Sequence, residues 1–160
     1  MIYAIIIKKG VWKVGIKPWV DYFLDLAKTC SSRSNCLRAQ VGAVIVGDDK
    51  KIKATGYNGT PSGVESWYER GECYRIKNNI ESGTRYETCR SIHAEQNAII
   101  QAGQDRCQNA TMYIWGHQMI CILCKRFIVQ AGIKDVYLKK DDTSEVIHVS
   151  VEDIKKELEN

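Results

Sequence analysis

Residues 110–140 have the sequence "ATMYIWGHQMICILCKRFIVQAGIKDVYLKK". The apolar run at 110–115 and the segment 134–140, with Val136, Tyr137 and Leu138 at its centre, have the length and residue types of strands, and residues 121–132 between them have a helical pattern. Gly132 stands where a helix commonly ends, because glycine adopts the left-handed C′ conformation without steric cost. A strand, a helix and a strand in this order predict a crossover that places both strands in one sheet.

The segments before and after this unit continue the alternation. Residues 41–46 and 51–57, "VGAVIV" and "KIKATGY", predict a hairpin of two buried strands. Apolar residues at helical spacing predict helices over 19–32 and 92–103, and the tail 151–160 has the pattern of a short amphipathic helix. This order of elements predicts an α/β fold in which helices cover a sheet.

The polar stretch from residue 58 to residue 90 is long for a loop, and such loops are usually functional or disordered. The sequence has no internal repeat and no shift in composition that would mark a linker. We therefore expect a single domain over 1–160, in which residues 1–17, with the apolar start "MIYAIII", form an N-terminal extension or an extra edge strand.

Charge and cysteine content limit the function classes. The formal net charge of +4 is weaker than that of a dedicated nucleic-acid binder, so we expect no nucleic-acid partner. The seven cysteines are odd in number and unevenly spaced, which favours a reducing, cytoplasmic location. The apolar start is too short for a signal peptide or a membrane span, so we expect no membrane partner either.

His93 and Glu95 belong to the first turn of the predicted helix 92–103. In the middle of a helix, residues two positions apart point to nearly opposite faces and would not act together. In the first turn, both side chains can lean past the helix end toward one point. The position of the pair therefore predicts a shared site at that point.

Cys121 and Cys124 begin the predicted helix 121–132. Their spacing lets two thiolates bind one ion, and the partial positive charge of a helix N-terminus favours the thiolate form. With His93 they make three protein ligands of the types that zinc prefers, and the fourth position stays open for a catalytic water. Glu95 is then the candidate base for that water. An H-x-E followed by a C-x-x-C pair is the pattern of zinc-dependent nucleobase deaminases.

Each half of this pattern has another interpretation. A histidine at a helix start is often a cap or a surface residue, and a single C-x-x-C can be a redox pair or half of a structural zinc site. A structural site would need a fourth ligand from the remaining thiols and imidazoles, which include Cys30, Cys36, Cys73, Cys89, Cys107 and His117. None of these completes a second C-x-x-C or H-x-x-x-H spacing, so the pattern favours a catalytic zinc.

Six segments of the sequence resemble, in the same order, the deoxycytidylate (dCMP) deaminases of the cytidine deaminase-like superfamily: "RSNCLRAQVGAVIV", "ATGYNGTPSG", "CRSIHAEQNAII", "ATMYI", "CILC" and "QAGIKDVY". The resemblance covers residues 19–138 and implies a three-layer α/β/α fold with a mixed central sheet covered by helices. It also implies zinc-dependent hydrolytic deamination of dCMP to dUMP and ammonia, which supplies the precursor of thymidylate. By similarity, His93, Cys121 and Cys124 hold the zinc and Glu95 moves the protons.

The resemblance further implies contacts with the nucleotide. Asn58 matches the asparagine that hydrogen-bonds the deoxyribose, although the dipeptide N-G is also a strong turn signal. Ser34 and Arg38 match positions that hold the 5′-phosphate, which suits a guanidinium, and Arg33 is a competing candidate. Ala94 is expected to offer backbone groups to the edge of the base.

The segment 59–90 matches an insertion of this family. The resemblance associates that region with an allosteric site, in a homohexamer, where dCTP activates and dTTP inhibits. Thr60, Pro61 and Gly63 are the candidate contacts, and turn formation is their alternative role. A triphosphate effector would bring magnesium with it.

The approach to the cysteines departs from the family pattern. Ile120 takes the place of a proline, and the span 115–120, "WGHQMI", is longer than usual. A proline in the first turn preorganises a helix, so its loss is expected to cost local rigidity rather than ligands. His117 in this loop is a candidate for contact with the substrate or with the surroundings of the zinc, and a solvated loop histidine is the alternative.

Three other functions share these motifs. A cytosine or adenosine deaminase acting on RNA or single-stranded DNA uses the same core, but the weak net charge argues against it. A bifunctional dCMP/dCTP deaminase would differ only at the phosphate end of the site. A catalytically silent zinc protein would have no use for Glu95.

Overall fold

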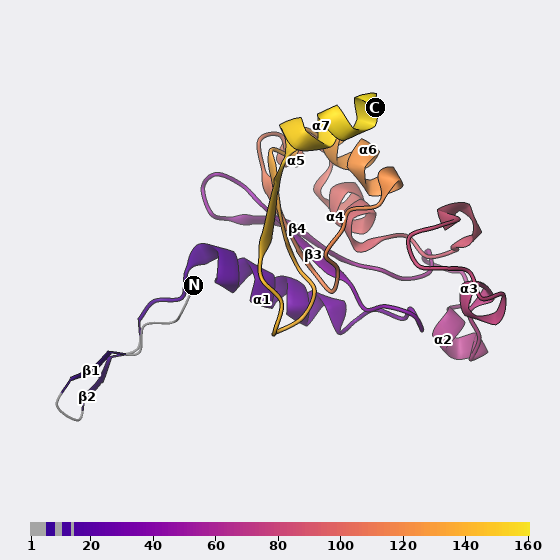
Figure 1. The fold of residues 1–160 in the computed structure, drawn as a ribbon, viewed down its shortest axis with the longest axis horizontal. Coiled ribbons are helices and arrows are strands. Elements are labelled where there is room, and N and C mark those ends of the chain that lie inside the picture. Colours follow the sequence, from indigo (N-terminus) through magenta and orange to yellow (C-terminus); the bar gives the residue numbers. More distant parts are fainter. Residues whose placement is uncertain (1–5, 9–10, 14) are drawn as a thin grey trace.

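The computed structural model describes residues 6–8, 11–13 and 15–160, and it describes side chains from residue 15 onward. The rest of the predicted extension 1–17 lies outside the described residues. Strands β1 (Ile6–Lys8) and β2 (Val11–Lys13) pair antiparallel in a two-stranded sheet of their own. In its described part this segment is therefore a separate hairpin and not an edge strand of the central sheet (Figure 1).

The central sheet has five strands in the order β4-β3-β5-β6-β7. Their bounds are β3 Gly42–Val46, β4 Ile52–Tyr57, β5 Thr111–Trp115, β6 Asp135–Lys139 and β7 Ile147–Ser150. Strands β5 and β6 are parallel, and the other neighbouring pairs are antiparallel, so the sheet is mixed. Because β4 and β5 both run antiparallel to β3, their carboxyl ends lie at the same edge of the sheet.

Helices cover both faces of this sheet (Figure 1). The helical segments are α1 Trp19–Ser31, α2 Trp67–Arg70, α3 Tyr74–Lys77, the 3-10 turn η1 Tyr86–Thr88, α4 Ala94–Ala102, α5 Gln104–Cys107, α6 Ile122–Ala131 and α7 Val151–Glu159. Helix α1 packs on β3 and β5 from one side, whereas α4 packs on β3 and β4 and also contacts α6. The described part of the chain has no helix that is both long and apolar enough to cross a membrane.

Two hydrophobic cores lie on opposite faces of the sheet. Strand β3 is buried along its whole length, and its alternate residues Val44 and Ile45 belong to different cores, as the two-residue period of a strand requires. Phe23 of α1 packs in the core that contains Val44, whereas Ala98 of α4 and Ile128 of α6 pack with Ile45. The arrangement of helix layer, sheet and helix layer confirms the predicted α/β/α fold.

The sequence pattern predicted the long elements and missed several short ones. Strand β7 pairs with β6, but it has only four residues and none of them is fully buried, so the alternation of Ile147 and Val149 with polar residues is too short to be a strong strand signal. The polar stretch from residue 58 to residue 90 contains α2, α3 and η1, each one turn or less. Turns of this length depend on tertiary contacts, because isolated short helices are not stable in water.

Candidate active site

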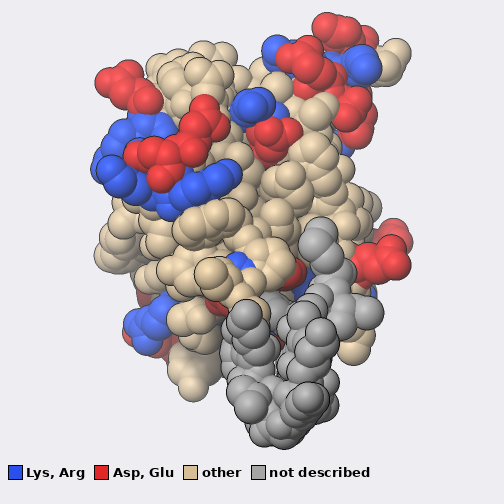
Figure 2. Space-filling model, turned by 90° about the vertical axis from the view of Figure 1, so that its left-hand side faces the viewer, with Lys and Arg blue, Asp and Glu red and all other residues tan. Residues whose placement is uncertain are grey.

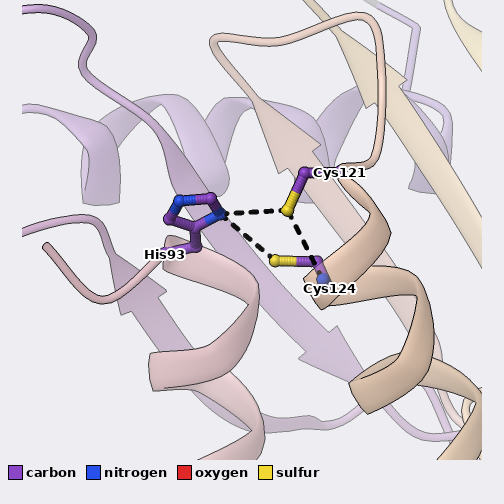
Figure 3. Close-up of side chains that lie close together, drawn as sticks. All are labelled: His93, Cys121 and Cys124. Carbon is purple, nitrogen blue, oxygen red and sulfur yellow. Dashed lines mark hydrogen bonds between the residues drawn. The ribbon is translucent and has the colours of Figure 1, made fainter. Parts of the chain in front are cut away.

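His93, Cys121 and Cys124 converge at the N-termini of α4 and α6. The Nδ1 atom of His93 lies 3.3 Å from the sulfur of Cys121 and 3.4 Å from that of Cys124. Figure 3 shows the imidazole at the start of one helix facing both sulfur atoms at the start of the other. In the described part of the chain, these three residues are the one group of metal-binding side chains whose donor atoms all lie within 4.8 Å of one another.

The spacing of these donor atoms fits zinc. A tetrahedral zinc with Zn–S and Zn–N bonds of about 2.3 and 2.0 Å holds a sulfur and a nitrogen ligand about 3.5 Å apart. The observed nitrogen–sulfur distances of 3.3 and 3.4 Å lie close to this value. Nitrogen and sulfur donors suit zinc, whereas magnesium prefers oxygen ligands. The donor set therefore fits zinc and gives no support for magnesium at this point.

The start of α4 turns the His93 side chain toward the cysteines. His93 is the N-cap residue and makes no side-chain capping bond. Gln96 performs the capping in its place, because its Oε1 accepts a hydrogen bond from the His93 backbone N–H at 3.0 Å. Gly56 of β4 lets this helix end approach the sheet, since a Cβ there would lie 2.3 Å from the Ala94 carbonyl oxygen. The imidazole is therefore free to face the sulfur atoms.

The start of α6 is built by Cys121 itself. Cys121 is the N-cap residue, and its sulfur accepts the backbone N–H of Cys124 at 3.4 Å. A donor of this kind at a helix N-terminus stabilises the thiolate over the thiol. Ile120, which replaces the proline of the family pattern, is 6% exposed and packs with the core beneath α4 and α6. Burial of its side chain anchors the approach to Cys121.

The titration of these groups is linked by hydrogen bonds. Contact with Cys124, and after it contact with His93, lowers the pKa of the Cys121 thiol. Hydrogen bonds to Cys121 and Cys89 raise the pKa of His93 to about 10, and a hydrogen bond to Cys121 together with burial raises the pKa of Cys124. A cation that binds here would displace the protons held by His93 and Cys124.

Glu95 is buried beside this cluster. It is 6% exposed, and burial raises the pKa of its carboxyl above the ordinary value. The residue lies in the first turn of α4, two residues after His93, as the sequence predicts. Both side chains line the same cavity, so the pair does share one site.

The cavity beside this cluster has a volume of about 190 Å³. Six of the predicted site residues line it: Asn58, Ala94, Arg38, Glu95, His93 and Cys121. Because His93 and Cys121 are among them, the donor cluster opens onto the space where a substrate would bind. The cavity therefore combines candidate metal ligands, a buried carboxyl and a basic side chain.

Asn58 and Ser34 organise the wall of the cavity. The Asn58 amide donates to the Ala39 carbonyl and accepts from the Val41 N–H, both at 2.8 Å. These bonds leave one N–H and one lone pair of the amide for another partner. The Ser34 hydroxyl donates to the backbone carbonyl of Asn58 at 2.8 Å and accepts from the backbone N–H of Cys36. Ser34 itself does not line the cavity.

Thr60, Pro61 and Gly63 lie in the turn that follows β4 and do not line the cavity. Asn35 bonds both the backbone and the hydroxyl of Thr60, and the Val64 N–H donates to the Pro61 carbonyl. Their turn chemistry is therefore visible in the structure, and their predicted role in effector binding stays a prediction.

Several cavity residues were not identified from the sequence. The Tyr86 ring meets the His93 ring edge to face at 5.4 Å between centroids. The hydroxyl oxygen of Ser91 is buried without a hydrogen-bond partner among the described residues, and Ser91 lines the cavity. Met119 of the lengthened loop lines it too. His117, which the sequence already offered as a candidate contact, also lines the cavity, and burial lowers its pKa. No local pattern marks Tyr86, Ser91 or Met119, because only the fold brings them to the site.

The chain matches the family model described as "Cytidine and deoxycytidylate deaminase zinc-binding region" over residues 17–140. It is 40% identical over 119 residues to the deoxycytidylate deaminase of Schizosaccharomyces pombe, a match that covers 74% of this chain and 36% of that protein. It is 32% identical over 128 residues to the deoxycytidylate deaminase of Mycobacterium phage D29, covering 77% of this chain and 95% of that one. This chain thus spans about a third of the length of the fission-yeast relative and nearly all of the phage relative.

A solved structure is similar as well. The crystal structure of the dCMP deaminase from cyanophage S-TIM5 in complex with dCMP and dUMP aligns with a TM-score of 0.54 and 28% identity. The alignment covers 78% of this chain and 83% of that one. Motifs, fold and matched residues agree, and the predicted family is confirmed: the chain belongs to the cytidine and deoxycytidylate deaminase zinc-binding family.

Proposed function

We propose that this chain is a zinc-dependent deaminase that hydrolyses dCMP to dUMP and ammonia. The observation that carries the proposal is the convergence of His93, Cys121 and Cys124 beside the buried Glu95 at the wall of one cavity. The names of the phage and fungal relatives and the nucleotides bound in the cyanophage enzyme support dCMP as the substrate.

The three converging residues are the proposed zinc ligands. Three protein ligands are typical of catalytic zinc, whereas structural sites use four. When bound, zinc supplies Lewis-acid activation of water for attack on the ring carbon that bears the amino group. Because the His93 ring is in contact with Tyr86 and its backbone with Gln96, its orientation is set before any ligand binds.

Glu95 is the proposed proton carrier. Its carboxylate accepts a proton from the attacking water and gives it to the ring nitrogen N3 of cytosine. It then takes a second proton from the hydroxyl group added at the ring carbon and passes it to the amino group, which leaves as ammonia. A carboxyl with a raised pKa holds a proton long enough to donate it, and burial raises the pKa of Glu95. The burial of this side chain therefore supports its role as both base and acid.

The remaining cavity residues are proposed to orient the nucleotide. The unused N–H and lone pair of Asn58 suit a deoxyribose hydroxyl, and the unpaired hydroxyl of Ser91 is available to a polar group of the substrate. Backbone groups of Ala94 face the base edge in this proposal, and Arg38 contacts the 5′-phosphate. We propose that Ser34 acts indirectly, by donating a hydrogen bond to the backbone carbonyl of Asn58 and so fixing the position of that residue.

Charge on the surface supports a small substrate over a nucleic acid. Figure 2 shows one face on which Lys and Arg side chains gather in groups mixed with Asp and Glu. Asp49, for example, pairs with both Lys51 and Lys53. A track for a phosphate backbone requires basic side chains gathered along one path, and the mixed groups on this face do not supply it.

The finer parts of the proposal follow the family. The chain acts as one domain, with residues 1–17 as an extension and 59–90 as an insertion, and its product feeds thymidylate synthesis. We further propose a homohexamer in which dCTP activates and dTTP inhibits through Thr60, Pro61 and Gly63. A sigmoidal dCMP saturation curve that dCTP makes hyperbolic would support this regulation, and a hyperbolic curve unmoved by either effector, with magnesium present, would exclude it.

A substrate panel tests the proposed activity. Zinc-loaded protein is incubated with dCMP, dCTP, cytidine and a short cytosine-bearing oligonucleotide, while cytosine absorbance and ammonia are followed. Turnover of dCMP supports the proposal, and turnover of dCTP alongside it indicates the bifunctional alternative. Turnover of the oligonucleotide alone indicates a nucleic-acid deaminase, and a zinc-loaded protein without any turnover contradicts the proposed function.

A further inference from the structure

Arg75 is a buried cation at the wall of the cavity. It lies in α3 and is 5% exposed. Over residues 15–160, no ion pair between a carboxylate and either Arg75 or Arg38 is present. A buried charge is costly unless it is fully hydrogen-bonded, so a guanidinium kept here without an acidic partner calls for a functional explanation.

The Arg75 guanidinium holds one segment of the cavity wall by its carbonyl groups. It donates to the backbone oxygens of Glu81 at 3.0 Å, Thr84 at 2.6 Å and Arg85 at 2.9 Å. It also lies 5.4 Å from the centre of the Tyr86 ring, in a cation–π contact. The Arg75 side chain therefore contacts four residues of the segment 80–86, which forms part of the cavity wall. This segment has no helix or strand before η1.

The wall fixed in this way holds Arg38. The Arg75 carbonyl accepts the N–H of Ile80 at 2.9 Å, and the Ile80 carbonyl in turn accepts Nη1 of Arg38 at 2.7 Å. A guanidinium has five N–H donors, so most donors of Arg38 stay available to a ligand in the cavity. Among the described residues, the only acidic side chain that lines this cavity is Glu95, beside the candidate metal ligands. Arg38 and Arg75 therefore give the cavity lining an excess of positive charge.

We propose that Arg75 is the positioning residue that gives the cavity its preference for a 5′-monophosphate over the free nucleoside. Its side chain acts through the wall, because the guanidinium holds the Glu81 carbonyl next to Ile80, and the Ile80 carbonyl accepts Nη1 of Arg38; the guanidinium also adds a positive charge at the cavity wall. The inference rests on the proposed function, since the phosphate belongs to the substrate proposed there.

Arg75→Gln tests this role by comparing dCMP with deoxycytidine as substrates. The KM for dCMP is expected to rise about tenfold or more, since a charge-assisted contact is misplaced, whereas kcat for dCMP and kcat/KM for deoxycytidine change by less than about twofold. Arg70→Gln is the matched control, because Arg70 lies in the same insertion but is exposed and paired with Glu65. Equal losses for both substrates would overturn the proposal in favour of a purely structural role.

A double-mutant cycle with Arg38→Gln tests whether Arg75 acts through Arg38. If it does, Arg75→Gln should add little to the loss already caused by Arg38→Gln, and fully additive losses would contradict positioning. Arg75→Lys keeps the charge without the planar fork and should restore only part of the preference. If Arg75→Gln does not fold, Arg75→Lys carries the test, and an unchanged KM for dCMP in this variant overturns the proposal.

Binding measurements separate this inference from the proposed activity. Titration calorimetry compares dUMP with deoxyuridine, and inorganic phosphate serves as the competitor, so no turnover is required. If the unaltered protein does not deaminate dCMP but loses its preference for dUMP on Arg75→Gln, the inference stands and the proposed function fails. If dCMP is deaminated and the variant keeps both the same KM and the same dUMP preference, the inference fails and the proposed function stands.

Discussion

The Nδ1 atom of His93 lies 3.3 Å from the sulfur of Cys121, although 28 positions of sequence separate the two residues. Each is the N-cap residue of its helix, so a single meeting of two helix ends creates the candidate metal centre. The carboxyl ends of β4 and β5 lie at the same edge of the sheet; the chain passes from β5 directly to α6, and from β4 through α2, α3 and η1 to α4. The position of the centre thus follows the general rule for ligand sites in α/β sheets.

Cys121→Ser should remove both zinc and activity. The serine oxygen is a poorer zinc ligand than a thiolate, and the α6 N-terminus loses its sulfur cap. Elemental analysis of the purified variant measures zinc per chain, and titration of chelator-treated parent protein with zinc should release protons from His93 and Cys124. Cys30→Ser, which alters a half-buried thiol outside the cavity, should keep both zinc and activity. A zinc-loaded Cys121→Ser protein would contradict the ligand assignment.

Glu95→Gln should keep zinc and lose activity by about a thousandfold, because the amide cannot carry a proton between water and the ring nitrogen. Steady-state rates with dCMP and the zinc content of the same sample provide the two readouts. Glu87→Gln is the control, since Glu87 is an exposed carboxylate of the same region that pairs with Arg85. Near-normal turnover by Glu95→Gln would remove the basis of the proposed mechanism.

Tyr113 should make the fold sensitive to alkaline pH. Burial raises the pKa of this phenol from 10.0 to about 12, so the unfolded chain loses the proton at lower pH than the folded chain. Its stabilising contribution is fully present below pH 10 and is lost as pH rises toward 12. Tyr113→Phe keeps the ring packing against Phe23 and Tyr137 and should show a flatter decline in Tm over this range.

The control for this experiment is Tyr57→Phe, because Tyr57 is 41% exposed on an edge strand. Thermal unfolding at several pH values between 8 and 12, followed by circular dichroism, compares the two variants with the parent protein. Parallel curves for all three proteins would show that Tyr113 does not contribute to the pH dependence.

Gly116→Ala should disturb the lengthened loop before Cys121. Gly116 has a φ of 99°, and a Cβ there would lie 2.2 Å from the Gln40 carbonyl oxygen, so both backbone strain and a clash result. We expect a loss of about 3 kcal/mol in unfolding free energy and a raised KM, since His117 and Met119 of this loop line the cavity.

Gly71→Ala separates the two causes of that loss. Gly71 also has a positive φ, 68°, but a Cβ at this position meets no atom within 4 Å. Only the backbone strain remains, so this variant should lose about 1 kcal/mol and keep its KM. Urea unfolding measures both free energies, and equal losses in the two variants would show that the close approach to Gln40 is not rigid.

The long elements were predictable because each carries its own periodic pattern. Gly132 adopts a φ of 79° at the end of α6 as its position in the sequence indicates, and β3 is buried on both faces as its unbroken apolar run indicates. Strand β7 was not predicted, since its alternating pattern spans only four residues, none of them fully buried, and the strand is held by pairing with β6. The bond between the Gln96 side chain and the His93 backbone was evident only from the structure.

The sequence by itself determined the α/β class and the family, and it singled out His93, Glu95, Cys121 and Cys124 as candidate site residues, because these follow from local periodicity and from short motifs at helix starts. Only the tertiary structure decided how the cavity wall is made. Arg75 meets the carbonyls of Glu81, Thr84 and Arg85 and supports Arg38 through the Ile80 carbonyl, all by contacts with backbone oxygens. Every residue has a backbone carbonyl oxygen, so the sequence does not indicate which of these oxygens accepts a hydrogen bond from a given side chain. The tertiary structure alone shows it.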